Sequence, residues 1–173
     1  MKKGILIIVV LVLFISCEGK APITAKVDVA KETSDINNVL NTWHKNADET
    51  NFEAYFTAMT NNSVFVGTDA TEVWGLQEFK DFSKPYFDNG SAWSFNPIDR
   101  NVYIDEEGKI AWFDELLATW MGVCRGSGVL KSTDTVWKIE HYVLSLTVPN
   151  DNMNEVLKVN KVKDAVFLKK YNY

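Results

Sequence analysis

The chain has 173 residues, of which 46% are hydrophobic and 24% are charged. This length and composition fit one globular domain with a hydrophobic core, and they exclude a disordered or fibrous chain. The formal net charge of −5, without a cluster of Lys or Arg, argues against a protein that binds nucleic acid.

The first residues form a separate segment, in which Lys2 and Lys3 precede the apolar run GILIIVVLVLFIS. This run is shorter than the ~20 residues that cross a bilayer, so residues 1–16 are predicted to be a secretory signal peptide. The letters FISC at its end resemble the lipobox of bacterial lipoproteins. That resemblance implies that Cys17 is lipidated and becomes the new N-terminus. An uncleaved anchor and an ordinary signal peptide are the alternatives.

Residues 17–33 are polar and small and are predicted to be a tether. If Cys17 carries lipid, Cys124 has no partner for an intramolecular disulfide, and stability must come from the core. Without Lys2 and Lys3 the basic residues fall from 18 to 16 against 23 acidic ones, a formal charge of −7. Attachment to a membrane would then depend on the lipid. The prediction is a protein of the bacterial cell envelope with a lipid anchor.

Three helices are predicted next. The first has apolar residues at the i, i+3, i+4, i+7 spacing of an amphipathic helix, namely Ile36, Val39, Leu40, Trp43 and Ala47. Ser34 or Asp35 can cap it. The second, TNFEAYF, has Thr50 and Glu53 in the relation of a capping box. The third, GLQEFKDFSKPYF, is expected to bend or end at Pro85.

Strands are predicted for most of the remaining domain. The stretch NNSVFVGTD, between the second and third helices, indicates a short strand between two turns. After the third helix, short turns separate four longer strands, at about residues 91–104, 109–120, 122–131 and 135–148. Long strands with short turns favour an antiparallel, strongly curved sheet. The tail, residues 151–173, is polar but has helical spacing.

This order of elements, with the stretches NFEAYF, VGTDATEVW and WKIEHYVLSL, resembles the SnoaL-like branch of the nuclear transport factor 2 superfamily. The domain is assigned to residues 34–150. The resemblance implies an α+β fold, in which a cone-like curved antiparallel β-sheet wraps around the N-terminal helices and encloses one pocket. Family members bind small molecules, catalyse isomerisation, dehydration or cyclisation, or carry out no chemistry, so the fold alone does not decide the function.

The stretch AWFDELL places Asp114 and Glu115 side by side in a predicted strand. Neighbouring residues of a strand point to opposite faces, so these two carboxylates cannot form a facing pair. The face that carries Trp112 and Asp114 is the bulkier and more aromatic one. It is expected to line the pocket, with Glu115 on the convex side.

On the last strand, alternation is expected to turn His141 toward the pocket. A turn centred near Thr133 would set Arg125 opposite His141. A buried Arg needs an acidic partner, for which Asp114 or a bound anion is available. The hypothesis is that Arg125 and His141 form the polar end of a pocket lined by aromatic side chains, namely Trp43, Tyr55, Trp74, Trp93 and Trp112.

These residues are compatible with three functions. The first is a domain that binds a small, partly apolar ligand. The second is an isomerase, dehydratase or cyclase that uses Asp114 or His141 for proton transfer without a cofactor, although both side chains could instead satisfy donors or pack in the core. The third is a non-catalytic homodimer formed through the convex face of the sheet. No metal site is expected, because His44 and His141 are the two histidines and lie far apart in the chain.

Overall fold

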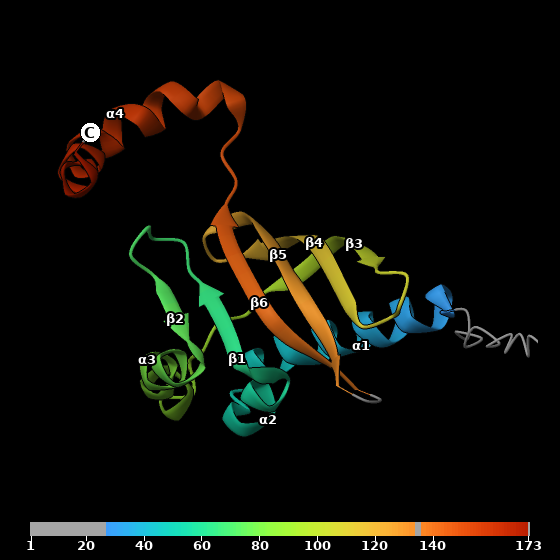
Figure 1. Cartoon of the computed structure of the whole chain (residues 1–173). Helices are drawn as coiled ribbons and strands as arrows, with labels where there is room; N and C mark the ends of the chain where they lie inside the picture. Colours follow the sequence, from blue (N-terminus) through green and yellow to red (C-terminus); the bar gives the residue numbers. More distant parts are fainter. Residues whose placement is uncertain (1–26, 134–135, 173) are drawn as a thin grey trace, which may run out of the picture.

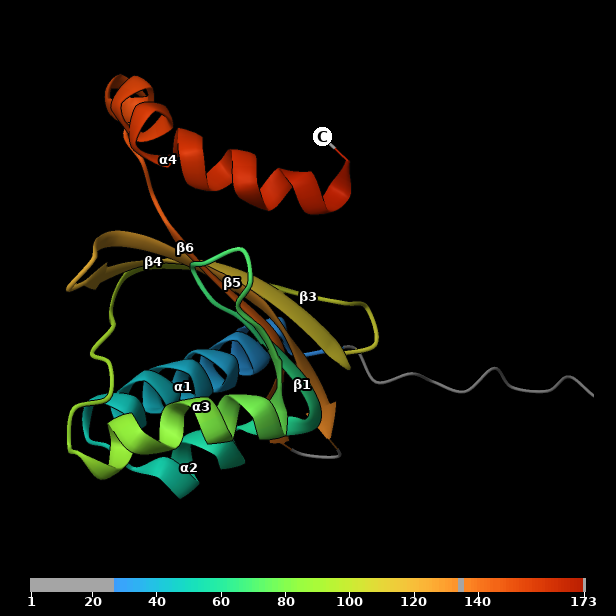
Figure 2. The same cartoon turned by 90° about the vertical axis from the view of Figure 1, so that its left-hand side faces the viewer.

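The computed structural model describes residues 27–133 and 136–172. The predicted signal peptide, Cys17 and residues 18–26 of the predicted tether lie outside this range. Three helices lie against one face of a curved sheet (Figures 1 and 2): α1 (Val29–Asp48), α2 (Phe52–Thr57) and α3 (Leu76–Asp88).

Six strands form the sheet, in the order β2-β1-β6-β5-β4-β3. Their bounds are β1 (Met59–Val66), β2 (Val73–Gly75), β3 (Asn96–Ile104), β4 (Ile110–Thr119), β5 (Gly122–Thr133) and β6 (Val136–Leu146). The sheet curves around the helices without closing, which confirms the expected α+β fold. One pair departs from the expected antiparallel sheet, because β1 and β6 run parallel. These two strands are far apart in the chain, so no hairpin dictates their direction.

The helix ends differ in detail from the predicted ones. Helix α1 begins earlier than expected, because Asp28 caps it and its carboxylate accepts a hydrogen bond from the backbone N–H of Lys31 at 3.1 Å. The predicted capping box of α2 is not formed, since its N-cap Asn51 makes no side-chain cap bond. Pro85 lies in the last turn of α3, and the helix continues to Asp88.

The core between the helices and the sheet is largely aromatic. Trp43 of α1 stacks on Tyr55 of α2 at 4.9 Å between ring centroids. Phe65 of β1 stacks on Phe79 of α3 at 4.1 Å. Rings of this size bury much apolar surface, and stacked pairs add a further ~1 kcal/mol each. The helices are thus held on the concave face mainly by aromatic contacts.

A β-bulge in β6 decides which of its side chains face the core. Val129 pairs with His141 and the next residue, Leu130, pairs with Ile139, so Glu140 is an extra residue in β6. Ile139 is buried before the bulge and Tyr142 after it. The extra residue reverses the alternation, and the predicted inward orientation of His141 is wrong for this reason.

Two glycines of β5 let side chains approach the concave face closely. A Cβ atom at Gly126 would clash with the Tyr142 hydroxyl and come within 2.9 Å of Glu115 Oε1. A Cβ atom at Gly128 would lie 2.9 Å from the Phe113 ring. Contacts this short are not tolerated by a real side chain, so both positions require glycine.

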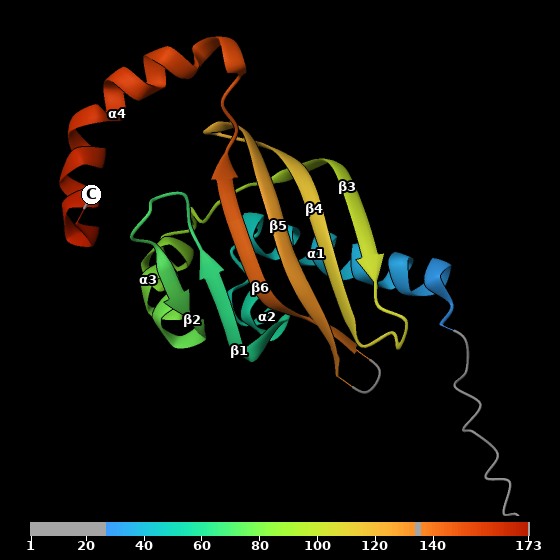
Figure 3. The ribbon, with the colours of Figure 1, turned by 45° about the horizontal axis from the view of Figure 1, so that its top comes forward.

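The C-terminal segment consists of η1 (Asn150–Asn152), α4 (Met153–Leu168) and η2 (Lys169–Tyr171). Figure 3 shows α4 leaving the end of β6 and standing clear of the sheet and of the other helices. None of its residues is buried. Within the described residues, no helix combines the length and the apolar character needed to span a bilayer.

Candidate functional site

The predicted facing of β4 is reversed in the structure. Phe113 and Glu115 are buried, whereas Trp112 and Asp114 lie on the outer, convex face of the sheet. Bulk was a misleading criterion, because the outer face carries its own aromatic stack, between Tyr103 and Trp112 at 5.9 Å. The inner acid is Glu115, and neither Asp114 nor Trp112 can contact a ligand inside the cone.

Arg125 and His141 also lie on the outer face. Arg125 pairs with Ser145 rather than with His141, because Thr133 pairs with Val136, a register further along the chain than predicted, and the bulge in β6 shifts it by one more residue. Its side chain is 55% exposed, and its Nη1 atom lies 3.9 Å from Asp114 Oδ1. An exposed pair at this distance contributes little to stability. The expected polar end of the pocket, made by Arg125 and His141, is therefore wrong.

The predicted aromatic lining residues separate into three groups. Trp74 and Trp93 line a cavity in the structure. Trp43 and Tyr55 are buried in the core behind that cavity. Trp112 is on the outer face.

The cavity that Trp74 and Trp93 line has a volume of about 450 Å³. It is bounded by α3, by the loop between β1 and β2, and by the turn between β4 and β5. Its lining includes eight aromatic side chains, which we call the aromatic pocket: Phe65, Trp74, Phe79, Phe82, Tyr86, Trp93, Phe95 and Trp120.

The walls of the aromatic pocket contain nearly parallel rings. Phe79 stacks on Trp74 at 5.8 Å and 15°, and on Trp93 at 5.8 Å and 22°. Polar lining groups are few, and Glu72 among them already accepts the backbone N–H of Asp69 at 3.1 Å. The pocket therefore offers flat apolar surfaces, with the Thr68 and Ser91 hydroxyls as further hydrogen-bonding groups.

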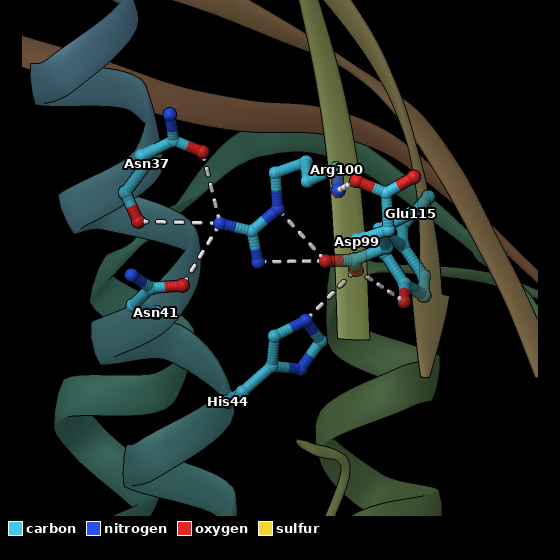
Figure 4. Close-up of polar contacts among 7 residues, drawn as sticks. Asn37, Asn41, His44, Asp99, Arg100 and Glu115 are labelled. Carbon is cyan, nitrogen blue, oxygen red and sulfur yellow. Dashed lines mark hydrogen bonds and ion pairs between the residues drawn. The ribbon is translucent and has the colours of Figure 1, made fainter. Parts of the chain in front are cut away.

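A buried polar network lies between α1 and the sheet (Figure 4). Its centre is the Glu115 carboxylate, whose side chain is 0% exposed. Arg100 of β3 donates to Oε2 through Nε at 2.9 Å and through Nη2 at 2.6 Å. The Oε1 atom lies 2.8 Å from His44 Nε2 and accepts the Tyr142 hydroxyl at 3.0 Å. Every strong acceptor position of this acid is thus in use.

Arg100 extends the network to α1. Its third nitrogen, Nη1, donates to Asn41 Oδ1 at 2.8 Å and to Asn37 Oδ1 at 3.2 Å (Figure 4). The two asparagines are one helical turn apart, so they present their oxygens on the same side of α1. Arg100 therefore ties the edge of the sheet to α1 through both its charge and its planar geometry.

The electrostatics of the network keep Glu115 ionised. Burial alone would raise the pKa of its carboxyl, but the hydrogen bond and charge of His44, together with Arg100, outweigh burial and hold that pKa below its ordinary value of 4.5. Burial and the neighbouring Glu115 raise the pKa of the Tyr142 phenol well above its ordinary value, so Tyr142 stays a donor. The network is a closed set of partners that joins α1 to three strands.

Sequence reasoning missed His44, Arg100 and Tyr142 as partners of Glu115. The signal that was present is the inner face of AWFDELL, which is apolar except for Glu115. Within residues 27–133 and 136–172, no three His, Cys, Asp or Glu side chains gather as metal ligands would.

A family model described as a SnoaL-like domain matches residues 36–149. A search of curated proteins found no match.

Solved structures share the fold at low sequence identity. A "putative dehydratase from the NTF2-like family" of Streptomyces avermitilis is 13% identical, with a TM-score of 0.59 over 69% of this chain and 99% of that one. An NTF2-like protein of unknown function from Pseudomonas putida is 11% identical, with a TM-score of 0.58 over 71% and 91%. A protein with a cystatin-like fold from Nostoc punctiforme is 10% identical, with a TM-score of 0.58 over 69% and 93%.

The network predicts a large stability effect at Glu115. The change Glu115→Gln leaves the Arg100 cation buried without a counter-ion and should lower the free energy of unfolding by about 3 to 5 kcal/mol at neutral pH. Asp114→Asn, on the outer face of the same strand, should lower it by less than about 0.5 kcal/mol. Urea denaturation followed by fluorescence measures both values.

Wild type and Glu115→Gln together also test whether Glu115 is ionised in the folded protein. Because the folded pKa is lower than the unfolded one, the stability from the charged carboxylate is complete above pH 4.5 and is lost as the pH falls toward the folded pKa. The difference between wild type and Glu115→Gln should shrink over that acid range. A difference that stays constant with pH would show that Glu115 is not held ionised.

Proposed function

The chain belongs to the SnoaL-like domain family, and from this membership we propose that it binds a small, flat, largely apolar molecule in the aromatic pocket. The observation that carries the proposal is the stack of Trp74, Phe79 and Trp93 along a cavity of about 450 Å³. Pockets for small molecules commonly have volumes of ~300–1,000 Å³ and mostly apolar walls.

The geometry of the walls favours a flat ligand. Nearly parallel rings present flat apolar faces on which a planar molecule can stack, which is a favoured arrangement of aromatic groups. The Thr68 and Ser91 hydroxyls supply hydrogen bonds for one polar group of that ligand. The proposed ligand class is therefore an aromatic or conjugated molecule with a single polar end.

The lining favours binding over catalysis. The titratable side chains among the lining residues are Glu72 and Tyr86, and Glu72 is already engaged with the backbone of Asp69. An isomerase, dehydratase or cyclase would need an acid or base against its ligand. Asp114 and His141 lie on the far side of the sheet from the pocket.

We propose further that the mature protein begins at Cys17 and is lipid-anchored in the bacterial cell envelope. Support comes from the basic residues, the short apolar run and the cysteine that closes it. Because α1 begins at Val29, the tether of this proposal is shorter than residues 17–33 and ends at the helix cap Asp28.

The outer face of the sheet supports a homodimer as an additional proposal. The stacked rings of Tyr103 and Trp112 are 48% and 47% exposed, and Ile98 and Ile110 are 59% and 45% exposed on the neighbouring surface of β3 and β4. Exposed apolar groups that gather on one face commonly mark an interface. A second copy of the chain is the proposed occupant.

The ligand proposal predicts that filling the aromatic pocket abolishes binding of an apolar probe. Ala92→Trp adds an indole to the pocket wall and should weaken the binding of N-phenylnaphthylamine at least tenfold, measured by its fluorescence. Ala118→Trp, on the outer face of β4, should leave the affinity within about twofold. Equal affinity in wild type and Ala92→Trp would contradict the proposed site.

The anchor proposal predicts lipid on one residue. Cys17→Ser should abolish incorporation of a palmitate analogue and move the protein from the membrane fraction to the soluble fraction. Cys124→Ser, at the other cysteine of the chain, should change neither result. Labelled palmitate on the Cys17→Ser protein would refute the anchor.

The dimer proposal predicts an effect of charge on the outer face. Trp112→Glu should convert a dimer into a monomer in sedimentation equilibrium, because a carboxylate would be buried without a partner. Trp120→Glu introduces the same charge at an exposed tryptophan outside that face and should leave the dimer intact. A wild-type protein that sediments as a monomer would refute the proposal.

A further inference from the structure

Helix α4 leaves all of its side chains exposed or half-buried, although its sequence does not suit a helix that stands alone. Apolar side chains are exposed on more than one of its sides, among them Val159 at 80% and also Val162. A helix of 16 residues is marginally stable by itself in water, and β-branched valines lower its stability further. Helix α4 therefore requires a surface on which to pack.

The charge of the C-terminal segment is opposite to that of the domain. Residues 151–173 contain five Lys and three acidic residues, a formal charge of +2. Residues 27–150 contain nine basic and nineteen acidic residues, a formal charge of −10. Within residues 27–133 and 136–172, none of the five lysines forms an ion pair. Opposite charges therefore favour packing of α4 on the acidic domain.

One face of α4 is distinguished from the others by its burial. Val156 and Phe167 are the two half-buried residues of this helix. Lys163 lies on the same face, because it is seven residues from Val156 and four from Phe167. Lys170 continues this face at the next turn. Figures 1 and 3 show that α4 runs from the end of β6 back toward the loop between β1 and β2.

Asp69 in that loop offers an acceptor to this face of α4. Its Oδ1 atom accepts the backbone N–H and the hydroxyl of Thr71, at 2.9 and 2.6 Å, whereas Oδ2 has no hydrogen bond among the described residues. These bonds are the main cause of the lowered pKa of Asp69, and the charges of Lys163 and Lys170 lower it further. Asp69 directly follows Thr68 of the pocket lining, so the two lysines approach the rim of the aromatic pocket.

Another part of the rim carries apolar surface without a cover. Trp120, in the turn between β4 and β5, lines the pocket and is 82% exposed, and Tyr86 of α3 is also exposed. The chain leaves β6 beside this turn, because Thr147 donates to the Val123 carbonyl through its backbone N–H at 3.0 Å and its hydroxyl at 2.7 Å. Residues 148–149 then form a short link to η1. A rotation about a link of this length can carry α4 across the pocket mouth.

We propose that α4 is a lid that closes over the mouth of the aromatic pocket. In the closed state Val156 and Phe167 cover Trp120, and Lys163 pairs with Asp69 at the rim. The lid keeps water from an apolar ligand and slows its release. This proposal rests on the ligand site proposed above, because it names the element that controls access to that site.

A disulfide tests the lid without a ligand. In the full chain with Cys17→Ser, Asp69→Cys and Lys163→Cys together should form an intramolecular disulfide under mild oxidation. Cys124 does not compete, because it is buried. Asp69→Cys with Lys161→Cys, on the opposite side of α4, should form none. A disulfide between two chains would show that α4 packs on a second copy and would overturn the lid, as would equal yields from the two pairs.

Stopped-flow fluorescence of N-phenylnaphthylamine tests the effect of the lid on release. Oxidation of the protein with Asp69→Cys and Lys163→Cys should slow dissociation of the probe at least about tenfold, and reduction should restore it. Lys163→Glu with Lys170→Glu should speed dissociation about threefold to tenfold, because like charges would then face Asp69. Lys158→Glu with Lys161→Glu makes the same change of charge on the opposite side and should leave the rate within about twofold.

The two proposals fail in different ways. Reduced protein that binds no probe would refute the ligand site and the lid with it. Probe that binds normally but leaves the oxidised protein at an unchanged rate would overturn the lid alone, as would equal rates in the two double Glu variants.

Discussion

The ion pair between Glu115 and Arg100 is the constraint on which the arrangement of the domain depends. The two residues lie on neighbouring strands, and their partners His44 and Tyr142 come from α1 and β6. A charge pair without exposure to water is stable only when each acceptor and donor is matched. The network therefore fixes how α1 crosses the sheet.

The packing around this pair shows how a polar centre is tolerated inside an aromatic core. Gly126 has no side chain, which leaves room for Tyr142 to reach Glu115. Phe65 stacks on Tyr142 at 5.4 Å between ring centroids. The aromatic residues thus shield the network from the aromatic pocket.

The fold could be predicted from the sequence because its signals are local. The helical spacing from Ile36 to Ala47 and the alternation along AWFDELL depend only on near neighbours. The polar network could not be predicted, because the partners of Glu115 are distant in the chain. His44 lies 71 residues from Glu115, and Tyr142 lies 27 residues from it. Alternation gives two faces without saying which one is inside. Trp74 and Trp93 were placed correctly as lining residues, whereas Asp114 and Arg125 were placed on the wrong face.

The bulge at Glu140 decides which side chains of β6 face the interior. Substitutions alter one side chain at a time, but if Glu140 joined the ladder opposite Val129, the strand beyond it would shift by one residue and its two faces would exchange. His141 would then replace Tyr142 on the interior, and an imidazole would lie beside the buried acid of β4. Loss of the bulge by a shift of register can therefore exchange a phenol for an imidazole on the interior in a single step.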